Sequence, residues 1–225
     1  MPGGYSIPSW RETVLALARQ RATEESLDLW GQAPGERPRF NYRWEHLLAV
    51  VGLCEKLGPP LGADMEVLLA AAWLHDIVKS RSVEQGAVAD AELAAEEAGR
   101  VLQGTDFPPS KVDAVVDAIR VHEGLFRDYP LQQLEAAVLW DADKLSKLGA
   151  TYLVHNLCIR PAFDPIFAGR PTDTLLVLQS LEQWLGMGER IVASMNTGPG
   201  RVEGARRLEF LREFVREMKL EWEKS

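Results

Sequence analysis

The chain has few of the features that mark secreted, membrane-spanning or disulfide-rich proteins. Only two cysteines occur in 225 residues, Cys54 and Cys158, too few for a disulfide framework and without CxxC spacing. The longest unbroken apolar run, 67–74, has 8 residues, whereas a membrane-spanning helix needs about 20. No succession of charged, apolar and small residues typical of a secretory leader is present at the N-terminus. We therefore expect a cytoplasmic protein without membrane contact, in which both thiols are buried and inert.

Positive charge is also scarce. Lysine and arginine contribute 25 residues against 33 aspartates and glutamates, which gives a formal net charge of −8 and an isoelectric point near 5.1. Proteins that bind duplex nucleic acid normally present a basic surface, so this balance argues against that class of partner. It still allows a small anionic substrate in a locally basic pocket. With 46% hydrophobic residues, the composition is that of a globular protein and excludes disorder as the dominant state.

Strand patterns are missing as well. No stretch combines period-two alternation with β-branched residues, whereas apolar residues recur at helical spacing along nearly the whole chain. The sequence therefore predicts an all-α protein of eight or nine helices. The expected helices span 9–20, 43–57, 64–78, 88–103, 108–122, 131–156 (as one helix or two), 172–195 and 201–222.

Caps and helix breakers set the expected boundaries. Ser9 and Asp64 are placed as N-caps, and the Gly58-Pro59-Pro60 sequence is expected to end the second helix. We expect residues 1–225 to form a single domain with a C-terminal helical extension at 172–223. The apolar residues of this extension are expected to pack in the core, with a homodimer contact as the alternative; they include Leu176, Leu181, Trp184, Leu185 and Trp222.

Polar residues interrupt three of the apolar helices. His75 and Asp76 directly follow the apolar run, and His46 opens another apolar helix 29 residues earlier. A buried imidazole or carboxylate is costly alone, and a divalent cation would satisfy both groups. The alternative is a His-Asp pair that only closes its helix, together with a histidine that is an ordinary core residue. Three such features on three helices favour a shared site.

The third feature is a pair of carboxylates, Asp141 and Asp143, inside a helix that is otherwise apolar. Because each residue of a helix turns by about 100°, these side chains point about 160° apart. Asp141 falls within the apolar stripe of the helix, so periodicity nominates Asp141 as the buried ligand. A helix that crosses the centre of a bundle is buried on two sides, so Asp143 stays open as the alternative.

In order and spacing, these residues resemble the H…HD…D pattern of the HD superfamily of metal-dependent phosphohydrolases. His46 matches the first histidine, His75 and Asp76 match the doublet, and the family register assigns the last aspartate to Asp143. The sequence HDIVK is similar to the HDIGK form common in the superfamily, and DADKL is similar to the corresponding segment of stand-alone bacterial HD hydrolases. The resemblance covers about 40–160. It implies an HD-domain helical bundle with the C-terminal helices packed on its core.

The resemblance also implies the ligands of one divalent metal ion. His46, His75, Asp76 and Asp143 are the implied ligands, and Mn, Fe, Co, Ni, Zn and Mg are the candidate ions. Asp141 is then a catalytic residue that supports the ligands or accepts a proton. We follow the family register in preferring Asp143 to Asp141 as the ligand.

Other basic residues are candidates for contact with substrate. Lys79 is expected to stabilise charge on phosphoryl oxygens and Arg81 to assist in binding, with a solvated basic helix end as the alternative for both. His122 either lines the pocket or is a cation at a helix C-terminus. Because two-metal HD proteins use additional histidines between the doublet and the last aspartate, and this chain has only His122 there, a mononuclear site is expected. His155 is expected to be an ordinary packed or surface residue.

The implied function is hydrolysis of a phosphate ester or anhydride, with a nucleotide or related metabolite as substrate, by attack of a metal-activated water molecule. Two alternatives stay open. One is a non-catalytic HD-fold module that senses a nucleotide or binds a partner protein, suggested by the C-terminal extension. The other is an HD-fold iron oxygenase, which would need a second metal.

Overall fold

The computed structural model describes residues 7–78, 86–163 and 174–223, and this part of the chain contains nine α-helices, two 3-10 helices and no strand. The predicted all-α class is confirmed. No helix in the described ranges is long and apolar enough to cross a membrane. The elements are α1 (Trp10–Leu29), α2 (Tyr42–Leu61), α3 (Met65–Leu74), α4 (Gly86–Gln103), η1 (Pro109–Lys111), α5 (Val112–Arg120), α6 (Leu134–Leu145), α7 (Gly149–Ile159), η2 (Arg160–Phe163), α8 (Thr174–Ala193) and α9 (Gly198–Glu223).

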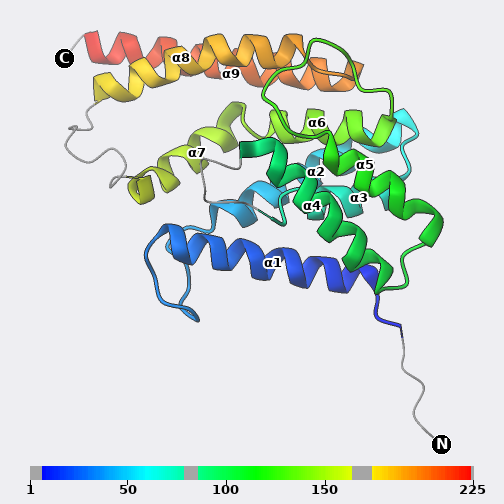
Figure 1. The fold of residues 1–225 in the computed structure, drawn as a ribbon. Helices are drawn as coiled ribbons and strands as arrows, with labels where there is room; N and C mark the ends of the chain where they lie inside the picture. The colour runs from blue at the N-terminus through cyan, green and yellow to red at the C-terminus, as the bar shows by residue number, and fades with distance from the viewer. Residues whose placement is uncertain (1–6, 79–85, 164–173, 224–225) are drawn as a thin grey trace, which may run out of the picture.

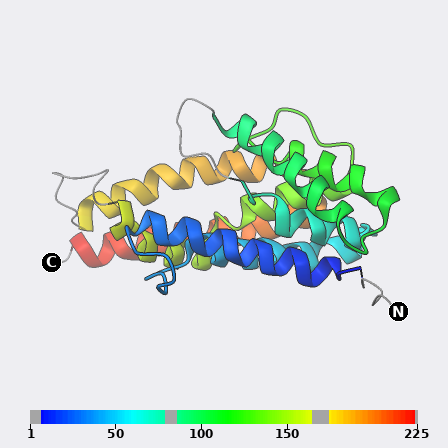
Figure 2. The same cartoon turned by 60° about the horizontal axis from the view of Figure 1, so that its bottom comes forward.

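The helices form a bundle with α2, α3, α5 and α6 at its centre (Figure 1). Helix α1 lies along one side and contacts α2 and α3, while the α8–α9 pair lies along the opposite side (Figure 1). Helix α6 touches both α2 and α9. The start of α1 and the end of α9 lie at opposite ends of the molecule (Figure 2). Helix α6 contacts both the central helices and α9. A substitution on either side of the bundle can therefore alter the position of α6.

Side-chain caps mark the start of α2 and α3. Ser9 precedes α1 as predicted. The Asn41 side chain accepts a hydrogen bond from the backbone N–H of Trp44, 3.1 Å away, and so caps α2. Asp64 caps α3 in the same way through the N–H groups of Glu66 and Val67.

The predicted ends of the first two helices were too early, and that of the third, at residue 78, was too late because α3 ends at Leu74. Helix α1 continues beyond residue 20 because Ala22 and Leu27 are still buried, and the chain turns only at Gly31, where φ is +61°. Helix α2 passes through the Gly58-Pro59-Pro60 sequence to Leu61. Gly62 then takes φ +74°, and the N–H groups of residues 62 and 63 satisfy carbonyls of the last turn.

Helix α6 runs through the interior of the bundle. All ten residues 136–145 are buried, so the helix is enclosed on every side. The segment predicted as one helix or two is divided at Gly149, whose φ is +84°. Cys54 is buried as expected, but Cys158 is exposed because it lies on the outward face of α7, so that prediction was wrong for one thiol.

Candidate metal centre

Three segments bring polar side chains together at the centre of the bundle. His46 lies on α2, His75 and Asp76 follow α3, and Asp143 lies on α6; we call these four residues the His-Asp cluster. The Nε2 atom of His46 is 3.4 Å from Nε2 of His75, 3.3 Å from Oδ1 of Asp143 and 3.5 Å from Oδ2 of Asp76. Each of the four residues is at most 8% exposed. The residues implied by the family pattern therefore face one buried point.

Backbone carbonyls fix the orientation of two imidazoles. The Nδ1 atom of His75 donates a hydrogen bond to the carbonyl oxygen of Ala72, 2.8 Å away. That bond assigns the proton to Nδ1 and leaves the Nε2 lone pair directed at the cluster. His122 repeats the arrangement, with Nδ1 2.6 Å from the carbonyl oxygen of Ile119 and Nε2 3.6 Å from Oδ1 of Asp76.

Ser146 orients the third imidazole. Its hydroxyl donates to the backbone carbonyl of Asp143 at 2.6 Å, so its oxygen can accept the Nδ1–H of His46 at 3.1 Å. His46 therefore also presents a free Nε2 lone pair to the cluster. An imidazole whose second nitrogen is anchored in this way is typical of a metal ligand.

Burial keeps two of the imidazoles neutral. It lowers the pKa of His75 to about 3, and it also lowers the pKa of His46, although the nearby Asp76 carboxylate opposes that shift. A neutral imidazole retains the lone pair that a metal ion needs. The two histidines are therefore in their ligand form at neutral pH.

Two lysines compensate the charge of Asp143. The ammonium group of Lys144 contacts Oδ2 and that of Lys147 contacts Oδ1. Burial alone would raise the pKa of Asp143, but the ammonium groups of Lys144 and Lys147 outweigh burial and hold the pKa well below its usual value. Lys144 also donates to the carbonyl oxygen of His122 at 3.1 Å. Asp143 is therefore an anion in the folded protein.

Arg43 plays the corresponding part for Asp76. Its guanidinium group pairs with Oδ2 of Asp76 and, at 2.8 Å, with the carboxylate of Glu25. Arg43 and His46 lie three residues apart, on one face of α2. The guanidinium stabilises the charged form of Asp76 at the edge of the cluster.

The two carboxylates of α6 face different neighbours. Both oxygens of Asp141 are taken up by the segment before α9, with hydrogen bonds from Asn196 N at 2.7 Å, Asn196 Nδ2 at 3.1 Å, Thr197 N at 2.8 Å and Thr197 Oγ1 at 2.7 Å. A Cβ atom at Gly200 would collide with Asp141. The structure thus places Asp143 in the cluster and Asp141 outside it, and the catalytic role of Asp141 stays a prediction.

The remaining predicted residues divide into three groups. His122 lies beside the cluster, with its ring centroid 5.0 Å from that of His75. His155 packs against the rings of Phe40 and Tyr42, and Tyr42 separates it from His46 of the cluster. Lys79 and Arg81 lie outside the described residues.

The donor set fits a divalent metal ion. His46, His75 and Asp143 each offer one ligand atom, and these atoms lie within 4.8 Å of one another; the same holds for His75, Asp76 and His122. The Nε2 lone pairs of His46 and His75 face each other across 3.4 Å and repel, and a cation between them would remove that repulsion. Mixed imidazole and carboxylate ligands suit Mn, Fe, Co, Ni or Zn.

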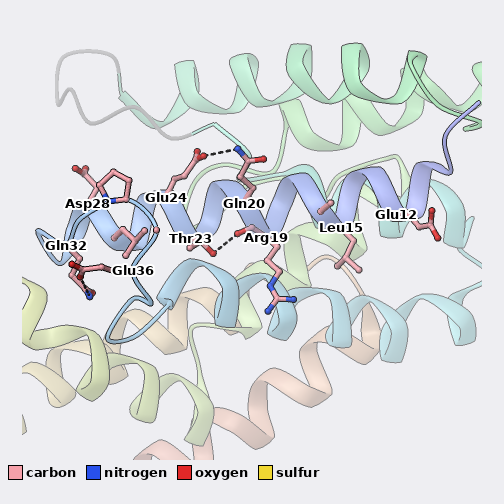
Figure 3. Close-up of a pocket in the computed structure, with 13 residues that line it drawn as sticks. Glu12, Leu15, Arg19, Gln20, Thr23, Glu24, Asp28, Gln32 and Glu36 are labelled. Atoms are coloured by element: carbon pink, nitrogen blue, oxygen red, sulfur yellow. Dashed lines mark hydrogen bonds between the residues drawn. The ribbon is translucent and has the colours of Figure 1, made fainter.

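An open cavity lies elsewhere on the molecule. A cavity of about 1080 Å³ runs along α1 and the segment that follows it, lined by Glu12, Arg19, Thr23 and Gln32 among others (Figure 3). It is wide open and includes no residue of the His-Asp cluster. Size alone therefore does not locate the chemistry of this protein.

Sequence reasoning missed the groups that surround the cluster. Arg43, Lys144, Ser146 and Lys147 were not among the predicted site residues. The available signal was spacing: Arg43 precedes His46 by three residues, and the other three lie within four residues of Asp143. Helical spacing predicts that a side chain lies near a site, but it does not predict which atom that side chain contacts.

Comparison with known proteins agrees with this geometry. The family model described as HD domain matches residues 43–148, a segment that contains the whole His-Asp cluster. The match to the HD domain covers a little under half of the chain. The resemblance drawn from the H…HD…D pattern is confirmed, and the matched segment lies within the predicted motif core of 40–160. Comparison with curated proteins found no match.

Solved structures extend the similarity beyond the matched segment. A predicted HD-superfamily hydrolase from an uncultured Thermotogales bacterium is 23% identical with a TM-score of 0.60, covering 96% of this chain and 94% of that one. An HD-superfamily hydrolase from Bacillus thuringiensis is 17% identical with a TM-score of 0.63, covering 96% and 100%. Bacillus subtilis YpgQ, in complex with ADP, is 22% identical with a TM-score of 0.58, covering 91% and 97%. These likenesses show a shared fold over nearly the whole chain.

Proposed function

We propose that this HD domain is a metal-dependent phosphohydrolase that cleaves a phosphate ester or anhydride. The observation that carries the proposal is the buried His-Asp cluster, in which two oriented imidazoles and two charge-compensated carboxylates face one point. A nucleotide or related metabolite is the proposed substrate class, and the ADP complex of YpgQ supports it by analogy of fold.

His46, His75, Asp76 and Asp143 would hold one divalent ion. When bound, such an ion lowers the pKa of a coordinated water molecule and polarises a phosphoryl oxygen. The chain contributes by keeping His46 and His75 neutral and by fixing their Nε2 atoms toward one point. Because these groups are oriented in advance, binding the ion requires little reorganisation of their side chains.

The cations at the cluster differ in their access to substrate. The side chain of Lys147 is 26% exposed and touches Asp143, so we assign to Lys147 the binding of a substrate phosphate. Lys144 is only 3% exposed and holds Asp143 in place. The Nε2 atom of His122 lies 3.6 Å from Asp76 and 3.7 Å from Glu123, so we assign to His122 a contact with substrate at the edge of the cluster. Lys79 and Arg81 stay predicted contacts to substrate.

Phosphate release tests the proposed activity. The purified chain is stripped of metal, reloaded separately with Mn, Co, Ni, Zn or Mg, and given a panel of nucleotides and p-nitrophenyl phosphate. We expect turnover with at least one metal and a loss of about 100-fold or more in His75→Ala and in Asp143→Asn. His155→Ala is the matched control, because that ring packs outside the cluster, and it should retain activity.

Two results would contradict the proposal. One is the absence of turnover with every metal and substrate, and the other is an unchanged rate in His75→Ala. Metal content separates the alternatives: a folded protein that binds no metal favours a non-catalytic module. A stoichiometry of one ion per chain counts against an iron oxygenase that needs two.

A further inference from the structure

A second cavity lies between the HD core and the C-terminal helices. It has a volume of about 330 Å³ and is bounded by α7, α8 and α9. No residue of the His-Asp cluster lines it. Its volume falls in the range of about 300–1,000 Å³ that is typical of small-molecule sites. We call it the α7–α9 cavity.

The walls of this cavity are mainly apolar and aromatic. Tyr152 and Trp184 stack on one another, with ring centroids 5.1 Å apart and an angle of 19° between the rings. Trp184 is fixed by a hydrogen bond from Nε1 to the carbonyl oxygen of Lys147 at 3.0 Å. Val177 and Phe214 continue the apolar wall on α8 and α9. Such walls accommodate an acyl chain or a flat apolar ring.

Two polar residues of the lining lie at the C-terminal end of α7, where Arg160 is the C-cap residue, and a third, Ser180, lies on α8. Asn156 and Arg160 lie four residues apart, one helical turn, so they are on one side of the cavity. Arg160 is the single charged residue among the described residues that line it. A guanidinium with no carboxylate in the same lining favours an anionic headgroup from outside the chain.

We propose that the α7–α9 cavity binds a small amphipathic anion, with its apolar part against Trp184 and its carboxylate or similar headgroup on Arg160. The site is separate from the His-Asp cluster and does not depend on the proposed phosphohydrolase activity. Decanoate is a suitable probe, and decanol, which has the same chain length without charge, is its comparator.

Calorimetric titration of the full chain below the micellar concentration tests this proposal. Wild type is expected to bind decanoate at least about 10-fold more tightly than decanol. Arg160→Ala should lose about 10-fold in decanoate affinity and leave decanol unchanged. Arg216→Ala removes an exposed arginine of α9 that does not line the cavity, and it should behave as wild type.

Cavity filling provides the second test. Val177→Trp should abolish binding of both probes while circular dichroism and the melting temperature show a folded protein. Binding that survives in Val177→Trp, or equal decanoate affinity in wild type and Arg160→Ala, would overturn the proposal. Failure of wild type to bind decanoate would also overturn it. Sedimentation provides a last check. If wild type sediments as a dimer and Val177→Trp as a monomer, the cavity belongs to a contact with a second copy, and the proposal of a small-molecule site is overturned.

Discussion

Two aspartates on one helix show how position alone separates structural and chemical roles. Asp141 and Asp143 are both buried, with 0% and 3% exposure, and only one residue stands between them. Asp143 meets imidazoles and ammonium groups, whereas Asp141 meets four hydrogen-bond donors of Asn196 and Thr197. The first arrangement suits a metal ligand, and the second fastens the start of α9 to α6.

Substitution of Asp141 should therefore affect stability before chemistry. In Asp141→Asn, an amide N–H₂ would face donors that need acceptors, so we expect the free energy of unfolding to fall by about 2–4 kcal/mol. Urea unfolding measures the change. Asp117→Asn, at a largely exposed site on α5, is the control and should be within about 0.5 kcal/mol of wild type. If Asp141→Asn left the free energy of unfolding unchanged, the contact between Asp141 and the start of α9 would contribute little to stability.

Ser146 provides a different prediction at the same scale. Ser146→Ala removes the acceptor for the Nδ1–H of His46, so the ring is no longer held in the orientation and tautomer that a ligand needs. We expect metal affinity to fall by roughly 10-fold or more, measured by competition with a chromophoric chelator. Ser180→Ala, which removes an exposed serine of α8, should leave the affinity unchanged. Equal affinities in Ser146→Ala and wild type would refute the role of Ser146.

At the level of helices, the close approach of α2 and α3 brings His46 near His75. A Cβ atom at Gly58 would lie 2.6 Å from Cδ2 of Leu68 and 2.7 Å from Sδ of Met65, so alanine there would force these two side chains to shift. We expect Gly58→Ala to lower the free energy of unfolding by about 1–3 kcal/mol. Thermal unfolding with calorimetry provides the measurement.

A second glycine of the same helix is the matched control. A Cβ atom at Gly52 would meet no atom within 4 Å, and Gly52 is exposed. Gly52→Ala should raise the free energy of unfolding by up to about 1 kcal/mol, because alanine favours a helix more than glycine does. If both variants changed stability in the same direction, the packing explanation for Gly58 would fail.

The sequence predicted helices better than it predicted their ends and contacts. Periodicity and cap residues located the starts of α1 and α3, although only Asp64 caps its helix through a side-chain hydrogen bond and Ser9 makes none. The continuation of α2 through Pro59 could not be predicted, since it depends on the αL conformation of Gly62 and on packing against α3. The pairing of Arg43 with Asp76 joins residues 33 positions apart and exists only in the assembled bundle.

The family register also decided what periodicity could not. Because residues 136–145 of α6 are buried on all sides, the helical wheel ranked Asp141 above Asp143 without telling which neighbours each would meet. Only the assembled helices show that α2 and the end of α3 lie beside Asp143, while the segment before α9 lies beside Asp141. Which of the two aspartates faces the imidazoles is therefore a property of the whole bundle.

For the whole molecule, the buried imidazoles predict a dependence of stability on pH. The pKa of His75 is lowered to about 3 by burial, whereas an unfolded histidine titrates near 6.5. As pH falls from about 6.5 toward 3, the unfolded chain takes up a proton that the folded chain does not. The free energy of unfolding of the chelator-treated protein should therefore fall, by up to about 1.4 kcal/mol per pH unit for this group.

Urea unfolding across this pH range checks the prediction. His75→Gln removes the titrating group, so its curve should fall less steeply between pH 6 and pH 4 than that of wild type. His155→Gln removes a buried histidine outside the cluster whose pKa is also lowered by burial, so its curve shows how much a second buried imidazole contributes. Parallel curves for wild type and His75→Gln would contradict the assignment of a neutral, buried His75.

The central claim is that one divalent cation joins α2, α3 and α6 through four side chains. A crystal structure of the Mn- or Co-loaded protein, with anomalous diffraction collected at the absorption edge of the metal, tests it most directly. The account predicts a single anomalous peak within coordination distance of Nε2 of His46, Nε2 of His75 and the carboxylates of Asp76 and Asp143. A peak elsewhere in the molecule, or none at full metal loading, would contradict it.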